Sequence, residues 1–566
     1  MRADDWIVDY LINIGVTDVF GIPGVIVMDF LYAVDKRKPE ITPHLNYHEQ
    51  GSSFAACGYA QTTGRLGVAY STRGPGLTNM ITAMADAYYD SIPVLFLTAH
   101  STKEIESKMR VMYNQEIDTV ALTKSITKRA VRIDNIEELQ NEVIRAYHEA
   151  MTGRKGPVFL DILNELFSCE IKCNAVKTMN TILHNEVDTS YEEKALFFLL
   201  KEKVSNASRP VVLIGNGARK KECKEIIKKI ADKSKIPILS SRTGQDIVPD
   251  SPYYFGFVGS RATRYSNFIL SKADLIIAIG NRLSFPIKSK SFTSIVEKAF
   301  FIRIDVDDSE FVRQLPYCAN FKMDCLKALS LIERADLQYK DSVEWINVCK
   351  RLKSELDCYD KNVVISNLMN IIESCEPDAT LVCDVGNHSF WVTTAYSYSK
   401  VTNRILYSGS FGTLGSALPK SIGAYYATKK NIICFTGDQG VQFNIQELQY
   451  ISKHRLPIKI VVLNNSSSGM IMERELARYG QHLVHTTSDS GYGYPNFEKI
   501  ADCYGFDYIR VDSSGIDNII YDNGPCIVEF IIEQNTYLEP SLPIGKPCQD
   551  LSPELSRKLY DELDNL

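Results

Sequence analysis

The 566-residue sequence has no basic block, no CxxC pair and no long apolar run. The net charge of −6 and the lack of a basic block argue against nucleic-acid binding. No apolar run reaches the roughly 18 residues of a membrane span, and the acidic N-terminal segment differs from a signal peptide. The 14 cysteines are scattered, as in reduced intracellular proteins. These absences predict a cytoplasmic protein without nucleic-acid or membrane partners.

Composition and periodicity predict several α/β domains. Hydrophobic residues make up 45% and charged residues 23% of a chain that is too long for one core. Apolar runs of strand length alternate with helical segments, which is typical of parallel, doubly wound sheets. We therefore expect three doubly wound α/β domains with mainly parallel sheets, over 1–165, 190–335 and 361–540, and a proline-rich C-terminal arm over 541–566.

The most informative stretch reads as strand, helix and strand, with oxygen-bearing side chains at both strand ends. An apolar strand, 431–435, runs into Gly437-Asp438-Gln439-Gly440, and an amphipathic helix is predicted after it. The next apolar strand, 458–463, leads to Asn465. Both side chains then lie at carboxyl ends of neighbouring parallel strands. Carboxylate and amide oxygens suit Mg2+, and the glycine-rich turn offers N–H groups to a phosphate.

This stretch resembles the GDG…NN motif of thiamine-diphosphate (ThDP) enzymes, although the chain reads GDQG where the family has GDG and a small residue. The resemblance implies bound ThDP and Mg2+, with Asp438, Asn465 and Ser467 around the metal. Asn387-His388 resembles the Gln-His pair that touches the cofactor's diphosphate, whereas His388 taken alone reads as a core or capping residue.

Other segments match further cofactor contacts of the family. Residues 410–420 resemble the support of the V-shaped cofactor, in which Gly412 offers its carbonyl and Leu414 is an apolar wedge. The cofactor-binding residues that the resemblance implies are Pro75, Asn79, Asn387, His388, Gly412, Leu414, Asp438, Gln439, Gly440, Asn465 and Met470.

Glu49 is the strongest catalytic candidate. It heads a helix of small residues that packs closely, although a solvated loop charge is the plainer interpretation. The segment around it resembles the pyrimidine-binding domain of the acetolactate-synthase group. The resemblance implies that Glu49 hydrogen-bonds N1′ of the aminopyrimidine, so that the cofactor's exocyclic nitrogen can remove the thiazolium C2 proton. Gln115 matches an active-site glutamine of the synthases.

The central domain carries a weaker signal. Its first strand enters Gly215-Asn-Gly217 without the rest of a dinucleotide fingerprint. In the acetolactate-synthase group this domain holds FAD, and Gly280, Arg282 and Asp305 match flavin-contacting positions. The resemblance makes FAD a candidate cofactor, while a nucleotide fold with an empty or different site is an equal alternative.

Several pocket positions differ from the synthases. Val25-Ile26 replaces small residues near the reacting carbon, and Arg474 stands where the synthases carry a tryptophan. Phe285-Pro286 is set against an Asp-Arg pair of the family. Arg474 is a candidate partner for a carboxylate or phosphate of an acceptor, and an exposed salt-bridging arginine is the alternative. These residues are the candidates for substrate selectivity.

The resemblance implies a ThDP- and Mg2+-dependent carboligase or lyase. It would decarboxylate a small 2-oxo acid, pyruvate first among them, and transfer the two-carbon unit to a carbonyl acceptor. In the family the domains of Glu49 and Asp438 meet across a subunit interface, so a homodimer or homotetramer is expected. The alternatives are a simple 2-oxo-acid decarboxylase, a flavin enzyme of the pyruvate-oxidase type, and a catalytically silent nucleotide-binding homologue.

Overall fold

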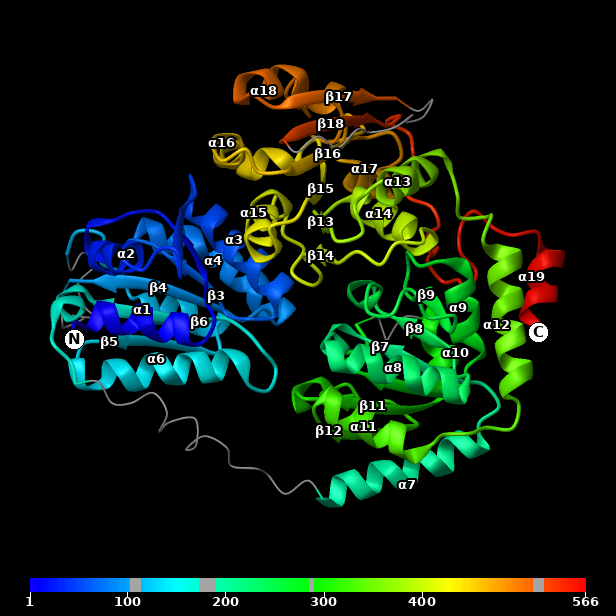
Figure 1. Ribbon diagram of the computed structural model, residues 1–566. Helices are drawn as coiled ribbons and strands as arrows, with labels where there is room; N and C mark the ends of the chain where they lie inside the picture. Colours follow the sequence, from blue (N-terminus) through cyan, green and yellow to red (C-terminus); the bar gives the residue numbers. More distant parts are fainter. Residues whose placement is uncertain (102–112, 173–189, 285–289, 513–523) are drawn as a thin grey trace.

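The computed structural model describes residues 1–101, 113–172, 190–284, 290–512 and 524–566. Three α/β domains follow one another along the chain, each built on a six-stranded sheet of parallel strands (Figure 1). The predicted fold class is thereby confirmed. Within the described ranges, no helix has both the length and the apolar character needed to cross a bilayer. Phe285-Pro286 lies outside those ranges.

The N-terminal sheet has the strand order β2-β1-β3-β4-β6-β5. Strands β3 (Gly67–Tyr70), β4 (Val94–His100) and β6 (Val158–Leu163) are buried throughout, because helices cover both faces of the sheet. The remaining elements are β1 (Asp18–Gly21), β2 (Thr42–Leu45), β5 (Arg129–Ile133), α1 (Ala3–Asn13), α2 (Met28–Asp35), α3 (Glu49–Thr63), α4 (Pro75–Asp90), α5 (Thr119–Thr123) and α6 (Ile136–Met151).

The central sheet has the order β12-β11-β10-β7-β8-β9. The strand order reverses between β7 and β10, where open α/β sheets form a ligand crevice. The strands are β7 (Pro210–Ile214), β8 (Ile238–Ser240), β9 (Tyr254–Phe257), β10 (Leu275–Ile279), β11 (Phe300–Asp305) and β12 (Cys318–Lys322). The helices are α7 (Ser190–Asn206), α8 (Lys221–Ser234), α9 (Arg264–Lys272), α10 (Lys290–Lys298) and α11 (Cys325–Ala335).

The C-terminal arm is packed onto the central domain. Helix α12 (Ser342–Leu356) connects the central and C-terminal domains, and the chain returns to end in α19 (Arg557–Asp564) near it (Figure 1). Cys548, Leu555 and Leu563 of the arm are buried in the hydrophobic core of the central domain. This burial fixes the arm along the side of the central domain.

The C-terminal sheet has the order β14-β13-β15-β16-β18-β17. Its strands are β13 (Thr380–Cys383), β14 (Ile405–Tyr407), β15 (Ile432–Gly437), β16 (Ile458–Asn464), β17 (Asp507–Val511) and β18 (Cys526–Ile531). Its helices are α13 (Val363–Glu373), α14 (Asn387–Tyr398), α15 (Ala417–Thr428), α16 (Leu448–Lys453), α17 (Gly469–Tyr479) and α18 (Phe497–Tyr504).

The helix predicted after Asp438 is broken in two. A 3-10 helix, η8 (Gly440–Glu447), precedes the short α-helix α16, and the backbone leaves helical geometry at Asn444. Asn444 is fully buried, and its side-chain Nδ2 donates to the carbonyl of Gly415 at 2.8 Å. This contact accompanies the break, and apolar periodicity alone does not reveal it.

Helices α3 and α15 form the tightest contact between the N- and C-terminal domains. A Cβ added to Gly58 of α3 would lie 2.1 Å from the carbonyl oxygen of Lys420. A Cβ added to Gly423 of α15 would lie 1.8 Å from the carbonyl oxygen of Ala55. The order of these contacts shows that the two helices run antiparallel, and their glycines let the backbones touch.

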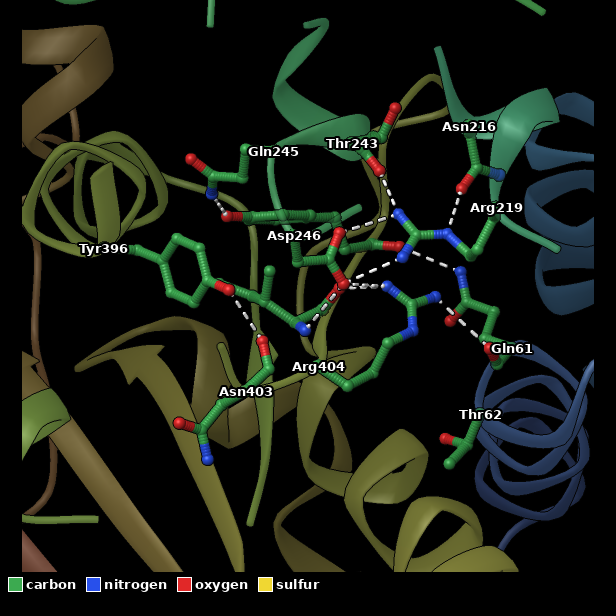
Figure 2. A network of polar contacts seen from close by, with 12 residues as sticks. Gln61, Thr62, Asn216, Arg219, Thr243, Gln245, Asp246, Tyr396, Asn403 and Arg404 are labelled. Atoms are coloured by element: carbon green, nitrogen blue, oxygen red, sulfur yellow. Dashed lines mark hydrogen bonds and ion pairs between the residues drawn. The ribbon is translucent and has the colours of Figure 1, made fainter. Parts of the chain in front are cut away.

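A buried ion-pair network joins all three domains (Figure 2). Asp246 of the central domain accepts two hydrogen bonds from Arg219 and one from Arg404 of the C-terminal domain, each 2.8 Å long. Arg404 also donates to the carbonyl of Gln61 in α3 at 3.2 Å. Burial alone would raise the pKa of Asp246, but the two arginines lower it well below its ordinary value. The network fixes the three domains relative to one another.

Candidate active site

The carboxyl ends of three adjacent strands in the C-terminal sheet bring the predicted diphosphate site together. β15 pairs in register with β16, so Asp438 and Asn465 follow neighbouring strand ends. β13 pairs with the other side of β15 and leads into α14, whose first two residues are Asn387 and His388. Parallel pairing therefore gathers residues that lie far apart in the sequence.

Asp438 is the centre of this site. It is 3% exposed, and its Oδ1 accepts hydrogen bonds from the N–H of Gln439 at 2.9 Å and the hydroxyl of Tyr492 at 2.7 Å. Burial raises the pKa of Asp438 to about 6, although these hydrogen bonds oppose the shift. Its Oδ2 is buried and has no partner among the described residues. A bound cation would supply that partner.

Further buried polar atoms near Asp438 lack a partner within the described ranges. They are Asn387 Oδ1, His388 Nε2 and Ser467 Oγ. Gly469 permits the close packing here, since a Cβ on it would lie 2.6 Å from Asn465 Nδ2 and 3.1 Å from Asn387 Nδ2. Native proteins satisfy nearly all buried polar atoms, so four unsatisfied atoms in one place indicate a polar ligand.

The chemistry of these atoms suits a phosphate-bound hard cation. Burial lowers the pKa of His388 to about 3, so its imidazole is neutral. Among the described residues, no three His, Cys, Asp or Glu side chains form a metal cluster. Asp438, Asn465 and Ser467 instead offer a carboxylate, an amide and a hydroxyl. Mg2+ is bound in this manner when phosphate and water complete its octahedron.

The loop that carries Gly412 and Leu414 is held in a defined shape. Gly412 has φ +75, which favours glycine, and open space lies beside its Cα atom. Gly415 donates its N–H to the buried Asp384 at 2.9 Å and accepts from Asn444 at 2.8 Å. Leu414, between these glycines, is 40% exposed. Its side chain is therefore not packed in the core, as the predicted wedge requires.

A buried ion pair fixes the same loop to the N-terminal domain. Lys420 Nζ lies 2.7 Å from Asp86 of α4, and both side chains are at most 1% exposed. Asp86 also accepts hydrogen bonds from the hydroxyls of Ser408 and Thr413. A buried ion pair of this kind keeps its geometry because breaking it would leave an unpaired charge in the protein interior.

The N-terminal domain presents a separate group of predicted residues. Glu49 is the first residue of α3, and its Oε2 accepts from Asn79 Nδ2 of α4 at 2.9 Å. Pro75 begins α4. Gln115 has φ +62, a left-handed conformation found at strained functional sites, and it lies against Gly74, where a Cβ would be 2.6 Å from the Gln115 carbonyl.

The two groups lie at opposite ends of the α3–α15 pair. Because the helices are antiparallel, Glu49 at the start of α3 faces the end of α15, whereas Leu414 precedes the start of α15. Helix α3 has 15 residues. At about 1.5 Å per residue, it separates the two groups by roughly 20 Å. We call these two groups half-sites; among the described residues, no hydrogen bond or ion pair joins Glu49 directly to the loop of Leu414.

The predicted selectivity residues are distributed between these half-sites. Val25 is 82% exposed, while Ile26 is 8% exposed and packs in the core of the N-terminal domain. Only Val25 of this pair has a side chain at the surface. Arg474 is exposed on α17, one helical turn after Met470.

The predicted flavin positions of the central domain have fewer unpartnered polar groups than the predicted diphosphate site of the C-terminal domain. The predicted residues there lie at the carboxyl ends of β7, β10 and β11; they are Gly215, Gly217, Gly280, Arg282 and Asp305. The glycine turn is closed on itself, since the N–H of Gly217 donates to the carbonyl of Gly280 at 3.2 Å. None of these residues contributes an unpartnered buried side-chain atom. The N–H groups of Gly215, Gly217 and Gly280 are all paired with backbone carbonyls and are therefore not free to bind a flavin.

Comparison with known proteins identifies the fold family. The thiamine pyrophosphate enzyme N-terminal TPP binding domain matches residues 1–122, the central domain 200–330, and the C-terminal TPP binding domain 384–524. The acetolactate synthase large subunit of Lactococcus lactis subsp. lactis (strain IL1403) is 30% identical, over 98% of this chain and 96% of its own. The chain belongs to the thiamine-diphosphate enzyme family.

Other relatives agree with this placement. The acetolactate synthase isozyme 2 large subunit of Escherichia coli (strain K12) is 28% identical over 98% of the chain and 100% of its own. Acetolactate synthase 1, chloroplastic, of Oryza sativa subsp. japonica is 28% identical over 97% of the chain and 87% of its own. The ThDP enzyme described here is therefore of the acetolactate-synthase-like type along its whole length.

The structure adds residues around the diphosphate site that the sequence did not single out. Tyr492 donates to Asp438 from a loop without periodicity, so no pattern marked it. Glu473 accepts from Asn387 Nδ2 at 2.8 Å. Asp384 directly follows β13, and its burial raises its pKa to about 6. The position of Asp384 directly after a predicted strand, two residues before Gly386, is the signal that could have found it.

Proposed function

We propose that this ThDP enzyme is an Mg2+-dependent carboligase that decarboxylates a 2-oxo acid, pyruvate being the leading donor, and transfers the two-carbon unit to a carbonyl acceptor. The observation that carries the proposal is the group of four unpartnered buried polar atoms around Asp438. A diphosphate with its Mg2+ would satisfy all four. The acetolactate synthases named above supply the reaction class.

The residues of this chain have separable tasks. Asn387, His388 and Asp438 would hold the diphosphate and its metal, together with Asn465 and Ser467. Bound ThDP supplies a nucleophilic carbon and an electron sink for loss of CO2. Leu414 and the carbonyl of Gly412 would set the angle between the cofactor's rings, since their loop is fixed by Asp384 and Asp86. Glu49 would hold a proton at N1′ of the aminopyrimidine.

The half-sites support a homodimer or a tetramer built from such dimers. Glu49 and Leu414 lie at opposite ends of α3 within one chain, so Glu49 of one copy must meet Leu414 of another. Exposed apolar side chains surround the C-terminal half-site, where Phe411, Leu414 and Phe443 are 40% to 50% exposed. Such surfaces are typical of faces that are covered in an assembly.

Mixing two inactive variants tests the shared site. Glu49→Gln and Asp438→Asn chains should each be inactive alone. In a mixed dimer, one site combines both altered residues and the other combines both native ones. Unfolding and refolding the two variants together should therefore recover about a quarter of wild-type activity. No recovery from a mixture that contains mixed dimers by native mass spectrometry would contradict the arrangement.

The reaction itself is tested by an NMR time course with carbon-13 pyruvate, ThDP and Mg2+. Wild-type protein should convert pyruvate to a ligated product, either by itself or after a carbonyl acceptor is added. The Glu49→Gln variant is the matched blank. Acetaldehyde without any ligated product would establish the simple decarboxylase instead. Unchanged pyruvate under every condition would remove it as the donor.

A flavin oxidase and a catalytically silent homologue each have a readout of their own. An enzyme of the pyruvate-oxidase type requires bound redox-active FAD, which the visible absorption spectrum of the purified protein would reveal. In a catalytically silent homologue the predicted cofactor residues would bind no ligand. The unpartnered buried atoms around Asp438 disfavour this alternative. Neither function has a structural feature that favours it over the carboligase.

A further inference from the structure

Two arginines from different domains lie beside the predicted diphosphate half-site: Arg474 on α17, and Arg261, whose guanidinium lies near Glu473, the residue that precedes Arg474. Arg474 lies one turn beyond Met470 on α17, so the two side chains share a face of the helix. Arg474 is exposed, and within the described ranges no hydrogen bond or ion pair engages its guanidinium. An unpaired arginine on the face that carries a cofactor contact is available to a ligand.

Arg261 reaches the same place from the loop between β9 and α9 of the central domain. Its Nη1 donates to the carbonyl of Leu538 at 2.9 Å, and its Nη2 lies 3.8 Å from Glu473 Oε2. The arm also braces this loop, since the N–H of Leu542 donates to the carbonyl of Ser260 at 2.9 Å. Arg261 is 27% exposed, so it is held in position and still reachable.

Glu473 connects Arg261 to Asn387, one of the predicted diphosphate residues. Its Oε1 accepts from Asn387 Nδ2 at 2.8 Å and from the N–H of Leu538 at 3.0 Å, while Oε2 faces Arg261. The negative charge of Glu473 disfavours binding of a further anion directly beside Asn387. We therefore expect the arginines to bind an anion at the exposed face of α17, away from Asn387.

The local charge is unbalanced. Burial lowers the pKa of Arg261; Glu473 opposes this shift, and the like charge of Arg474 adds to it. Arg261 thus has one nearby carboxylate, Glu473, which is already engaged by two N–H donors, and Arg474 has no ion pair among the described residues. A partly buried cation without full compensation is stabilised by an added oxyanion, which two arginines can bind through charge-assisted hydrogen bonds.

We propose that Arg261 and Arg474 form a subsite for an oxyanion, carboxylate or phosphate, carried by the carbonyl acceptor. The inference rests on the proposed carboligase function and names its acceptor class. Met470 places the pair close to the cofactor, and the extra helical turn, about 5.4 Å, leaves room for the acceptor's carbonyl between them. The arm contributes by bracing the loop that carries Arg261, through the hydrogen bond from Leu542 to Ser260.

Acceptors that share a two-carbon aldehyde skeleton test this subsite in the ThDP- and Mg2+-loaded protein. Glycolaldehyde is the neutral acceptor, glycolaldehyde phosphate carries the phosphate, and glyoxylate carries the carboxylate. For Arg474→Met and Arg261→Met, kcat/KM for an anionic acceptor should fall relative to glycolaldehyde by about tenfold or more. The loss should appear mainly in KM, and Arg474→Lys should restore part of it.

The controls separate this effect from folding and from cofactor binding. Arg478→Met removes an exposed charge one turn further along the same helix and should leave the ratio unchanged. Whichever acceptor, glycolaldehyde phosphate or glyoxylate, loses more kcat/KM in the arginine variants identifies the anion that the subsite binds. An equal fall for charged and neutral acceptors, or a matching loss of ThDP affinity, would refute the subsite.

Direct binding distinguishes failure of the subsite from failure of the proposed reaction. Titration calorimetry of glycolaldehyde phosphate and of glyoxylate into the loaded protein requires no turnover. Binding that weakens about tenfold in Arg474→Met supports the subsite even where pyruvate is not the donor. Absence of binding by wild-type protein at millimolar concentrations overturns it.

Discussion

Replacing Glu49 by glutamine should reduce turnover by about a hundredfold or more while leaving ThDP affinity within about tenfold of wild type. Glutamine keeps the size of the side chain and can still accept the hydrogen bond from Asn79. It cannot exchange a proton with the aminopyrimidine. Initial rates and a ThDP titration by protein fluorescence measure the two quantities separately.

A glutamate in the first turn of another helix provides the matched control for this substitution. Glu137 lies in the first turn of α6, is exposed and belongs to no half-site. Glu137→Gln removes the same kind of favourable helix-end charge, so it should cost stability comparably and leave turnover unchanged. Near-native turnover in Glu49→Gln would remove Glu49 from the mechanism, and equal loss in both variants would trace the effect to the fold.

The sheets and the diphosphate half-site were predictable because they depend on local patterns. Apolar runs such as 458–463 gave the strands, and strand–helix–strand spacing placed Asp438 and Asn465 at adjacent strand ends. Asn387 and His388 joined them because β13 pairs with β15. These placements require only periodicity and the rule that parallel strand ends meet.

Contacts between distant segments were not predictable in the same way. The pair Asp86–Lys420 spans two domains, and each residue alone reads as a surface charge on a helix. Arg261 becomes a candidate only through its contacts with Glu473 and the carbonyl of Leu538. The break at Asn444 comes with a hydrogen bond to Gly415 that overrides the helical periodicity. These features depend on tertiary packing, which a single sequence does not encode in local form.

Replacing Asp438 by asparagine should weaken Mg2+-dependent binding of ThDP by about a hundredfold or more, because metal and diphosphate would bind as one unit. Asparagine keeps the shape of the side chain and an oxygen for the hydroxyl of Tyr492 and the N–H of Gln439. It loses the charge at the position where Oδ2 has no protein partner among the described residues. Titration with ThDP at fixed Mg2+ measures the change.

Thermal unfolding separates this loss of binding from a loss of folding. Without cofactor, Asp438→Asn should unfold at or above the wild-type temperature, since it removes a buried charge that lacks a full set of partners among the described residues. Adding ThDP and Mg2+ should then raise the melting temperature of wild type and leave the variant nearly unchanged. Asp489→Ala, an exposed change in the same domain, should behave as wild type. An equal cofactor-induced shift in Asp438→Asn would show that the metal is held elsewhere.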